Sequence, residues 1–312
     1  MAAQPSHHPI FNEFREFRGH VPEGFDADFI GSLTNKKFLM AQVQSFGPII
    51  RPGRPPFDEN YFGWIDILES VVLAKDRYTM FELGAGYGRW AVCAAMAARQ
   101  KGIEDVRLTL VEAEPCHVEW LHEHLANNSV ETKNVEIVGA ALGASDDEIL
   151  FYVGTPDDAV VSKADYWYGQ SVIKPHERLA HGIFALKPAF SLGTYHGRNV
   201  IELESGWKAI AVPQKALAPL LLKHETIDLM DLDVQGLEFN VLSTAASEIN
   251  ERVRRVHIGT HGRDIEDQLR ALFSGLGWTC IRNYPCGSMT ETPYGLVEFV
   301  DGIQAWINPG LN

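Results

Sequence analysis

Apolar and polar positions follow two different periods along this chain. Short apolar runs predict buried β-strands near residues 78–83, 106–111, 135–143, 226–233 and 255–260. Apolar residues at helical spacing predict helices near residues 61–72, 89–100, 116–126 and 264–276. Further strands are expected near residues 279–283, 295–300 and 303–307, as an antiparallel edge at the C-terminal end. Alternating strands and helices are typical of the α/β class with a mainly parallel sheet.

The N-terminal segment departs from this pattern. Phe11, Phe14 and Phe17 recur at helical spacing and predict a short helix that docks one aromatic face on the rest of the chain. Prolines and glycines then stiffen residues 47–57. This stiff segment is interpreted either as a plain linker or as a lid that uses one of its arginines, Arg51 or Arg54.

The end of the proline-rich segment at residue 57 predicts the domain organisation. Residues 1–57 form an N-terminal arm or lid, and residues 58–312 form one α/β domain. Within it, residues 154–207 are expected to be an insertion on the substrate side, because long segments of this kind in compact domains are usually functional or disordered. Its aromatic and amide side chains can hold a sugar by stacking and hydrogen bonding, or can simply anchor the loop. Tyr168 and Gln170 are the substrate candidates.

The glycine-rich turn at the end of the first predicted strand carries the main functional signal. It reads Glu82-Leu83-Gly84-Ala85-Gly86-Tyr87-Gly88, and Arg89 follows. Glycines at this spacing allow positive φ and a close approach of a ligand to the backbone, at the start of a helix. A dinucleotide-binding turn would place its third glycine where Arg89 stands. The tighter spacing after a glutamate resembles that of S-adenosylmethionine (SAM) methyltransferases.

This resemblance assigns a cofactor site. SAM has no phosphate, so an acidic residue is tolerated beside its cationic amino and sulfonium groups. The residues assigned to the cofactor from this turn are Glu82, Gly84, Ala85, Gly86 and Gly88. An acid at the tip of the second strand can accept both ribose hydroxyls; Glu114 is the choice and Glu112 the rival. Ala141, at the tip of the third strand, leaves room for the adenine ring or is ordinary packing.

Residues near the later strand tips supply candidate chemistry. Asp233 ends the strand near residues 226–233, and His261 follows the strand near residues 255–260. His261 is the candidate general base because its ordinary pKa of about 6.5 suits neutral pH, and Asp233 would orient the imidazole or accept from the substrate. Alternatively, His261 caps a turn and Asp233 caps a helix. Asp231 is assigned to the substrate side.

Three ordered motifs resemble the FkbM-type SAM-dependent methyltransferases. They lie at residues 82–88, 111–115 and 231–238, and the last reads Asp-Leu-Asp-Val-Gln-Gly-Leu-Glu. The family's usual lysine is Asp231 here, and the glutamate before the family's glycine is Gln235. The resemblance implies a Rossmann-like class I methyltransferase fold with a seven-stranded sheet. It also implies SAM-dependent O-methylation, often of a sugar hydroxyl in a glycan or natural product.

Two further interpretations follow from the same residues. The departures at Asp231 and Gln235 allow an alternative function, a catalytically weak or inactive SAM- or SAH-binding partner subunit. Asp231, Asp233, Glu238 and His261 could also gather around Mg²⁺, but Asp231 and Asp233 stand about 6–7 Å apart along a strand. A divalent metal is therefore conceivable but not favoured.

Composition sets the remaining expectations. The chain has 312 residues, 46% of them hydrophobic and 22% charged, and a formal net charge of −14. A charge of this sign repels nucleic acid. The four cysteines lack metal-ligand spacing and predict buried free thiols, and His117, His122 and His124 are expected on the surface. We expect a cytoplasmic protein with a small-molecule or glycan acceptor and no membrane partner, and a homodimer is left open.

Overall fold

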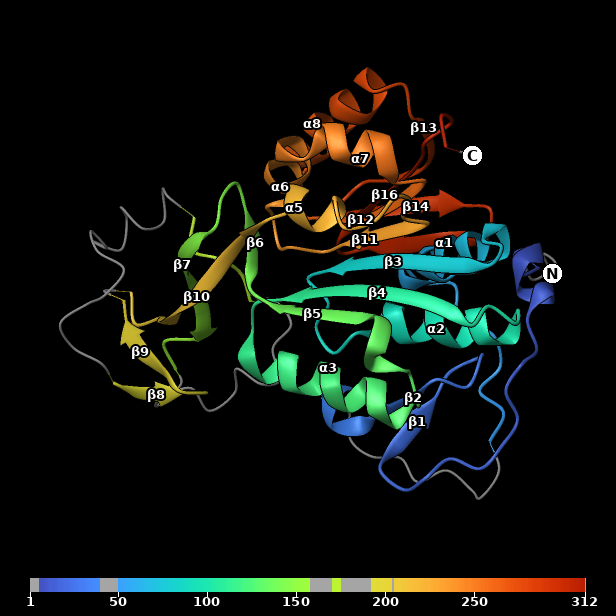
Figure 1. Cartoon of the computed structure of the whole chain (residues 1–312), viewed down its shortest axis with the longest axis horizontal. Coiled ribbons are helices and arrows are strands. Elements are labelled where there is room, and N and C mark those ends of the chain that lie inside the picture. Colours follow the sequence, from blue (N-terminus) through green and yellow to red (C-terminus); the bar gives the residue numbers. More distant parts are fainter. Residues whose placement is uncertain (1–5, 40–49, 158–169, 175–191, 204, 312) are drawn as a thin grey trace.

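The computed structural model describes residues 6–39, 50–157, 170–174, 192–203 and 205–311 (Figure 1). Its main feature is a seven-stranded sheet with the order β13-β16-β12-β11-β3-β4-β5. The strands are β3 (Arg77–Leu83), β4 (Asp105–Glu112), β5 (Val135–Gly139), β11 (Leu229–Leu232), β12 (Arg255–Thr260), β13 (Thr279–Tyr284) and β16 (Gly302–Ile307). β16 runs antiparallel to both of its neighbours. This order and direction confirm the predicted Rossmann-like class I methyltransferase fold.

Helices cover both faces of this sheet (Figure 1). One face carries α1 (Asn60–Leu73), α2 (Arg89–Gln100) and α3 (Pro115–Asn127), and the other carries α5 (Ala218–Leu221), α6 (Glu238–Thr244), α7 (Ala246–Arg252) and α8 (Arg263–Gly275). Side chains of a strand point alternately to the two faces. On β3, Tyr78 and Met80 therefore pack with α1 and α2, while Phe81 and Leu83 pack with the helices of the other face.

A second sheet begins where β5 ends. It contains β6 (Ala141–Gly143), β7 (Asp147–Gly154), β8 (Gly193–Tyr195), β9 (Arg198–Glu202) and β10 (Lys208–Ala216). The single strand expected over residues 135–143 is thus divided at Ala140, and its second half pairs with β10 instead of continuing the main sheet. β7 also pairs with β10, in the antiparallel direction. Apolar side chains of this sheet pack against Trp120 of α3.

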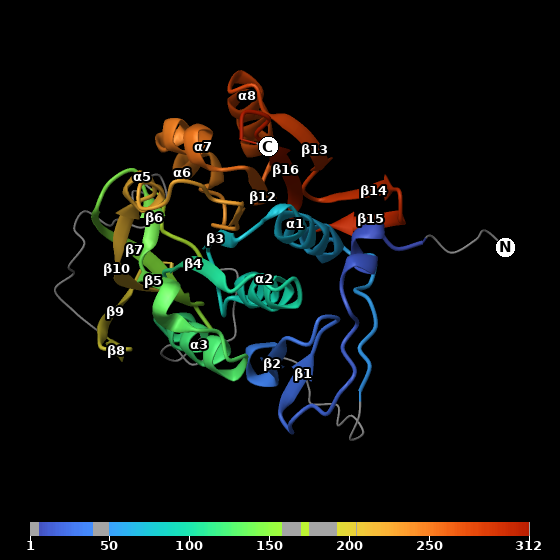
Figure 2. The same cartoon turned by 45° about the vertical axis from the view of Figure 1, so that its right-hand side comes forward.

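Smaller elements flank the main sheet. They are the 3₁₀ helices η1 (Pro9–Glu13), η2 (Lys36–Leu39) and η3 (Thr132–Asn134), the pair β1 (Phe25–Ala27) and β2 (Leu33–Asn35), and the hairpin β14 (Ser288–Thr292) and β15 (Gly295–Phe299). The strand expected near residues 295–300 as part of the sheet edge lies in this separate hairpin, which packs near η1 and α1 (Figure 2). None of the described helices is long and apolar enough to cross a membrane.

The N-terminal segment differs in detail from its prediction. η1 is a short 3₁₀ helix, because Pro9 begins it and the extended backbone at Phe14 ends it. Phe11 within it is buried. Arg51 and Arg54 both pair with Glu16 of the N-terminal segment, and neither lines the two cavities described below. The proposed lid arginines therefore fix the segment to itself.

A buried ionic cluster joins α1 to the sheet. The Asp66 carboxylate is fully buried, and it accepts hydrogen bonds from Arg255, Arg282 and His257. Burial alone would raise the pKa of Asp66, but the surrounding cations hold it well below its usual range. Glu69 also pairs with Arg255.

Removing Asp66 should therefore destabilise the fold strongly. Asp66→Ala leaves two arginines without their buried partner, and we expect the free energy of unfolding to fall by about 3–5 kcal/mol. Denaturant unfolding followed by circular dichroism measures this change. Glu131→Ala removes an exposed pair with Lys133 and serves as the control, which should be indistinguishable from the parent protein. Equal stability of all three proteins would contradict the structural role of Asp66.

Candidate functional site

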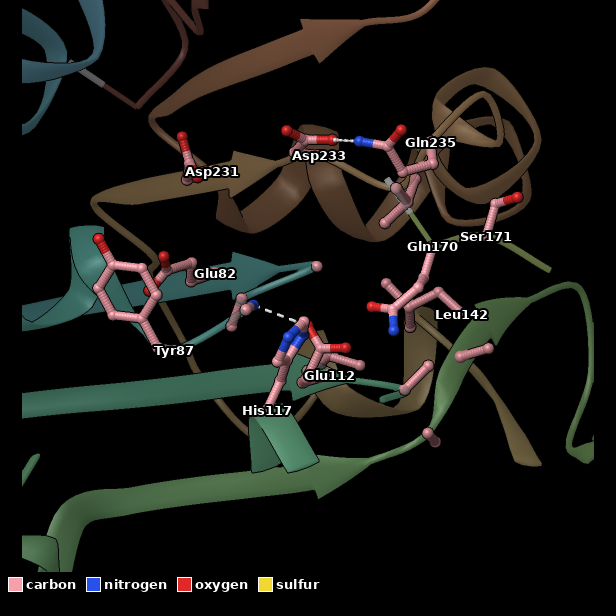
Figure 3. Close-up of a pocket in the computed structure, with 18 of the residues that line it drawn as sticks. Glu82, Tyr87, Glu112, His117, Leu142, Gln170, Ser171, Asp231, Asp233 and Gln235 are labelled. Atoms are coloured by element: carbon pink, nitrogen blue, oxygen red, sulfur yellow. Dashed lines mark hydrogen bonds between the residues drawn. The ribbon is translucent and has the colours of Figure 1, made fainter. Parts of the chain in front are cut away.

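A cavity of about 420 Å³ opens at the carboxyl ends of β3, β4 and β11 (Figure 3). In the order of the strands, β4 and β5 follow on one side of β3, and β11 and β12 lie on the other side of β3. Ligands of open α/β sheets bind at this kind of switch point, outside the carboxyl ends of the strands. The predicted cofactor residues Glu82, Gly84, Ala85, Gly86 and Ala141 line the cavity.

The glycine turn adopts the backbone that its sequence predicts. Gly84, Gly86 and Gly88 have φ angles of 79°, 54° and 77°. A Cβ atom on Gly84 would lie only 1.8 Å from the carbonyl oxygen of Asp233. The backbone N–H groups of Gly84 and Ala85 donate to the carbonyl of Val111, at 2.9 and 3.0 Å. These contacts hold the turn against the ends of both neighbouring strands.

Glu82, at the end of β3, bonds to the start of the helix that follows the glycine turn. It is 3% exposed, and its carboxylate accepts the backbone N–H groups of Trp90 and Ala91, at 3.1 and 2.8 Å. It thereby satisfies free donors in the first turn of α2. Burial raises the pKa of Glu82 well above its ordinary value, and the nearby Asp231 raises it further. Glu82 lines the cavity, and no ion pair joins it to a lysine or arginine among the described residues.

The two acids at the end of β4 lie in different surroundings. Glu114, the residue chosen from the sequence, is fully buried as the N-cap of α3, where it accepts from the backbone N–H of His117 at 2.7 Å. Glu112, the rival, lines the cavity and accepts from the backbone N–H groups of Gly86 and Glu114, both at 2.7 Å. The proline after Glu114 starts the helix and makes that glutamate a cap. Glu112 therefore lines the cavity and Glu114 does not, and the assignment of either acid to the ribose stays a prediction.

The far wall of the cavity comes from β6 and neighbouring segments. Ala140, Ala141 and Leu142 supply small and apolar surface, and Gln170 supplies an amide that is 6% exposed. Tyr168, the other predicted substrate residue, lies outside the described residues.

Several residues that line the cavity were not predicted from the sequence. His117 and His124 were expected on the surface but are 2% and 1% exposed, and His117 lines the cavity. Phe38 of η2 and Tyr87 of the glycine turn also line it, and their rings stack. The N-terminal arm thus reaches the cavity through Phe38. The sequence around Phe38 does not indicate this contact, because the cavity is formed by residues far along the chain.

A second, smaller cavity of about 90 Å³ adjoins the first. Asp231 and Asp233 line both cavities, and Asp301 lines only the smaller one. Burial raises the pKa of Asp231 to about 7, although the charge of His257 partly offsets this effect. Gln235, in the left-handed region at φ 53°, donates its amide to Asp233 at 2.9 Å.

His261 lies beside these aspartates but lines neither cavity. Its Nδ1 atom is 2.8 Å from the buried carboxylate of Glu238, and its Nε2 atom is 3.4 Å from Asp233 and 3.5 Å from Asp301. Burial lowers the pKa of His261, but the bond to Glu238 and the carboxylates around it raise it to about 9. The ring is then mainly imidazolium at neutral pH, and in that form it cannot accept a proton. The assignment of His261 as a general base stays a prediction.

The predicted cysteine environment is confirmed only in part. All four cysteines are free, and Cys93 and Cys116 are buried as expected, but Cys280 is exposed and Cys286 is half-buried.

The sheet order, the glycine turn and the cavity at the switch point together define a methyltransferase of the Rossmann-like class. The family model of the methyltransferase FkbM domain matches residues 82–275, and the chain belongs to this family. A relative from Jannaschia sp. (strain CCS1), named "Putative methyltransferase", is 24% identical over 310 residues, which cover 95% of this chain and 98% of that protein.

Solved structures are more distant. The crystal structure of methyltransferase FkbM from Methylobacillus flagellatus has 11% identity and a TM-score of 0.42, over 75% of this chain and 45% of that one, so the match spans less than half of its length. A structure titled as a putative O-methyltransferase from Klebsiella pneumoniae has 11% identity and a TM-score of 0.40, over 81% of this chain and 83% of that one.

The contact between Gly84 and Asp233 can be tested by a paired substitution. Gly84→Ala adds a methyl group against a backbone carbonyl, whereas Gly102→Ala adds one at φ 76° with no atom within 4 Å. Gly102→Ala should lower the unfolding free energy by about 1–2 kcal/mol through backbone strain alone. Gly84→Ala should cost clearly more, because the turn and the end of β11 must separate. Equal losses in denaturant unfolding would contradict this contact.

Proposed function

We propose that this protein is an SAM-dependent O-methyltransferase whose acceptor carries a sugar-like hydroxyl. The observation that carries the proposal is the charge of the larger cavity beside the glycine turn. Among the described residues, four acidic side chains line it, those of Glu82, Glu112, Asp231 and Asp233, against one guanidinium, that of Arg89. Such a lining repels a pyrophosphate and attracts a nucleoside that bears a positive sulfur and an amino group.

The lining residues supply matching groups for each part of that cofactor. Glu112 is available to the ribose hydroxyls, because a carboxylate accepts more hydrogen bonds than the two it receives from the backbone. Ala141 and Leu142 offer apolar surface to the adenine ring. Glu82 and Asp231 also line the cavity, and their carboxyl groups are the proposed partners of the cationic end of the cofactor.

The acceptor would approach from the side of Asp233 and Gln170. SAM supplies a methyl group on an activated sulfur, so the chain mainly has to align the acceptor oxygen with it. Asp233 and the amide of Gln170 face the cavity and can hold hydroxyl groups by hydrogen bonding. Asp233 also stands beside His261, so the proton of the hydroxyl would leave toward this pair. Polar acceptors and donors of this kind fit a sugar better than an apolar ring.

The assignment of Glu112 predicts a pH dependence of cofactor binding. Burial raises the pKa of Glu112 to about 7, although the backbone hydrogen bonds from Glu114 and Gly86 oppose the shift. Ribose hydroxyls would donate to the ionised form, so binding below pH 7 must release a proton. We expect the Kd for SAH to rise by up to about tenfold for each pH unit below 7 and to level off above it.

Isothermal titration calorimetry with SAH between about pH 6 and pH 8 measures this dependence. Glu112→Gln should weaken binding and make the pH dependence shallower. Glu114→Gln keeps an oxygen for the helix cap and should leave both unchanged. The reverse result would restore Glu114 as the ribose ligand, and absence of SAH and SAM binding in the folded parent protein would overturn the proposed function.

Turnover is tested by incubating the protein with SAM and a panel of sugar nucleotides and glycosides. We expect SAH to form with at least one acceptor, and Asp233→Asn to lower kcat by about 10²–10⁴-fold, because proton removal from the hydroxyl is impaired. SAH binding by this variant, measured in parallel, should stay close to that of the parent protein. Tight SAM binding without SAH from any acceptor would instead indicate a non-catalytic partner subunit.

A further inference from the structure

Three potential metal ligands converge where β11 and β12 end and β16 begins. They are Asp233, His261 and Asp301, and one donor atom of each lies within 4.8 Å of the others. The Nε2 atom of His261 is 3.4 Å from Oδ1 of Asp233 and 3.5 Å from Oδ1 of Asp301. A good N–H···O bond is shorter, at about 2.9–3.0 Å, and this buried nitrogen has no hydrogen-bond partner among the described residues.

The same separations suit ligands that share one cation. Metal–ligand bonds of about 2.0–2.2 Å place neighbouring ligand atoms about 3.0 Å apart in an octahedron and about 3.4 Å apart in a tetrahedron. The two distances from Nε2, 3.4 and 3.5 Å, lie at the upper limit of this interval and just beyond it, so a small movement of the two aspartate side chains would bring all three ligands to one ion.

Glu238 orients the imidazole for this role. Its side chain is fully buried, and its Oε1 atom is 2.8 Å from Nδ1 of His261. A bound metal ion would displace the Nε2 proton of the imidazolium, so that the remaining proton stays on Nδ1 against Glu238 and the Nε2 lone pair points toward Asp233 and Asp301. A carboxylate behind the second ring nitrogen is the arrangement that metal-binding histidines almost always show.

Asp231 gives independent support. Its side chain is 6% exposed, it lines both cavities, and no described residue hydrogen-bonds its carboxylate. The smaller cavity is also lined by Asp233, Asp301 and Glu59, and the described residues pair no lysine or arginine with Asp231, Asp233 or Asp301. Buried carboxylates normally have a partner, and the partner that fits this opening is a cation.

We propose that Asp233, His261 and Asp301 bind one divalent metal ion, with Glu238 as the positioning residue behind the histidine. Two carboxylates and one imidazole suit an ion between the hard and borderline classes, and Mn²⁺ is the representative probe. Under the proposed function, an ion at this place would acidify an acceptor hydroxyl that approaches Asp233. The metal site itself does not depend on that function.

The test is Mn²⁺ binding to the tag-free full chain, followed by electron paramagnetic resonance of the free ion and by calorimetry. We expect one saturable site per chain. Asp301→Asn should weaken it at least tenfold, and Glu238→Gln by about 10–100-fold. Asp267→Asn removes an exposed carboxylate on α8 and should have no effect. Asp301 does not line the larger cavity, so Asp301→Asn should still bind SAH like the parent protein.

Two results would overturn the proposal: no saturable Mn²⁺ binding by the folded parent protein, or equal affinity in the parent protein and in Asp301→Asn. Either result together with normal SAH binding leaves the proposed methyltransferase function intact. Saturable Mn²⁺ binding without SAH or SAM binding would support the metal site and reject that function instead.

Discussion

The site depends on one close contact, in which the α-carbon of Gly84 lies against the carbonyl oxygen of Asp233. Because there is no room for a side chain here, the turn after β3 and the loop after β11 lie at a fixed separation. The backbone N–H of Asp233 also donates to the carbonyl of Leu83 at 2.9 Å. Glu82 on one side and Asp233 on the other are therefore held at the same edge of the sheet, and the larger cavity lies between the segments that carry them.

This geometry concentrates negative charge in a poorly solvated place. Glu82, Glu112 and Asp231 are each less than a tenth exposed, and burial raises the pKa of all three. Ionised carboxylates in such surroundings are costly unless something positive is near them. A cationic ligand would lower that cost, because its positive charge would interact with carboxylates that form no ion pair with a lysine or arginine among the described residues. This interaction would contribute to the affinity for the ligand.

The sequence predicted those features that are encoded locally. The strand–glycine–helix segment could be recognised because spacing alone specifies the turn, and the strand order follows from the family that the motifs resemble. Local patterns failed where distant segments decide the outcome. Glu112 and Glu114 are both acids at a strand end, and only the start of α3 at Pro115 turns the second into a helix cap. Phe38 and Asp301 reach the site from far along the chain.

Two histidines, one in β12 and one just after it, lie in ionic clusters that differ in how far their charges are balanced. His257 meets Asp66, whose carboxylate is also bound by Arg255 and Arg282, so that cluster is electrically closed and needs no ligand. His261, just beyond the same strand, meets three carboxylates, and none of them is paired with an arginine or lysine among the described residues. Among the described residues the imidazolium of His261 is the one cation that pairs with these three carboxylates, so the cluster keeps an excess of acidic groups. Its place beside Asp233 is accounted for if a cation completes it.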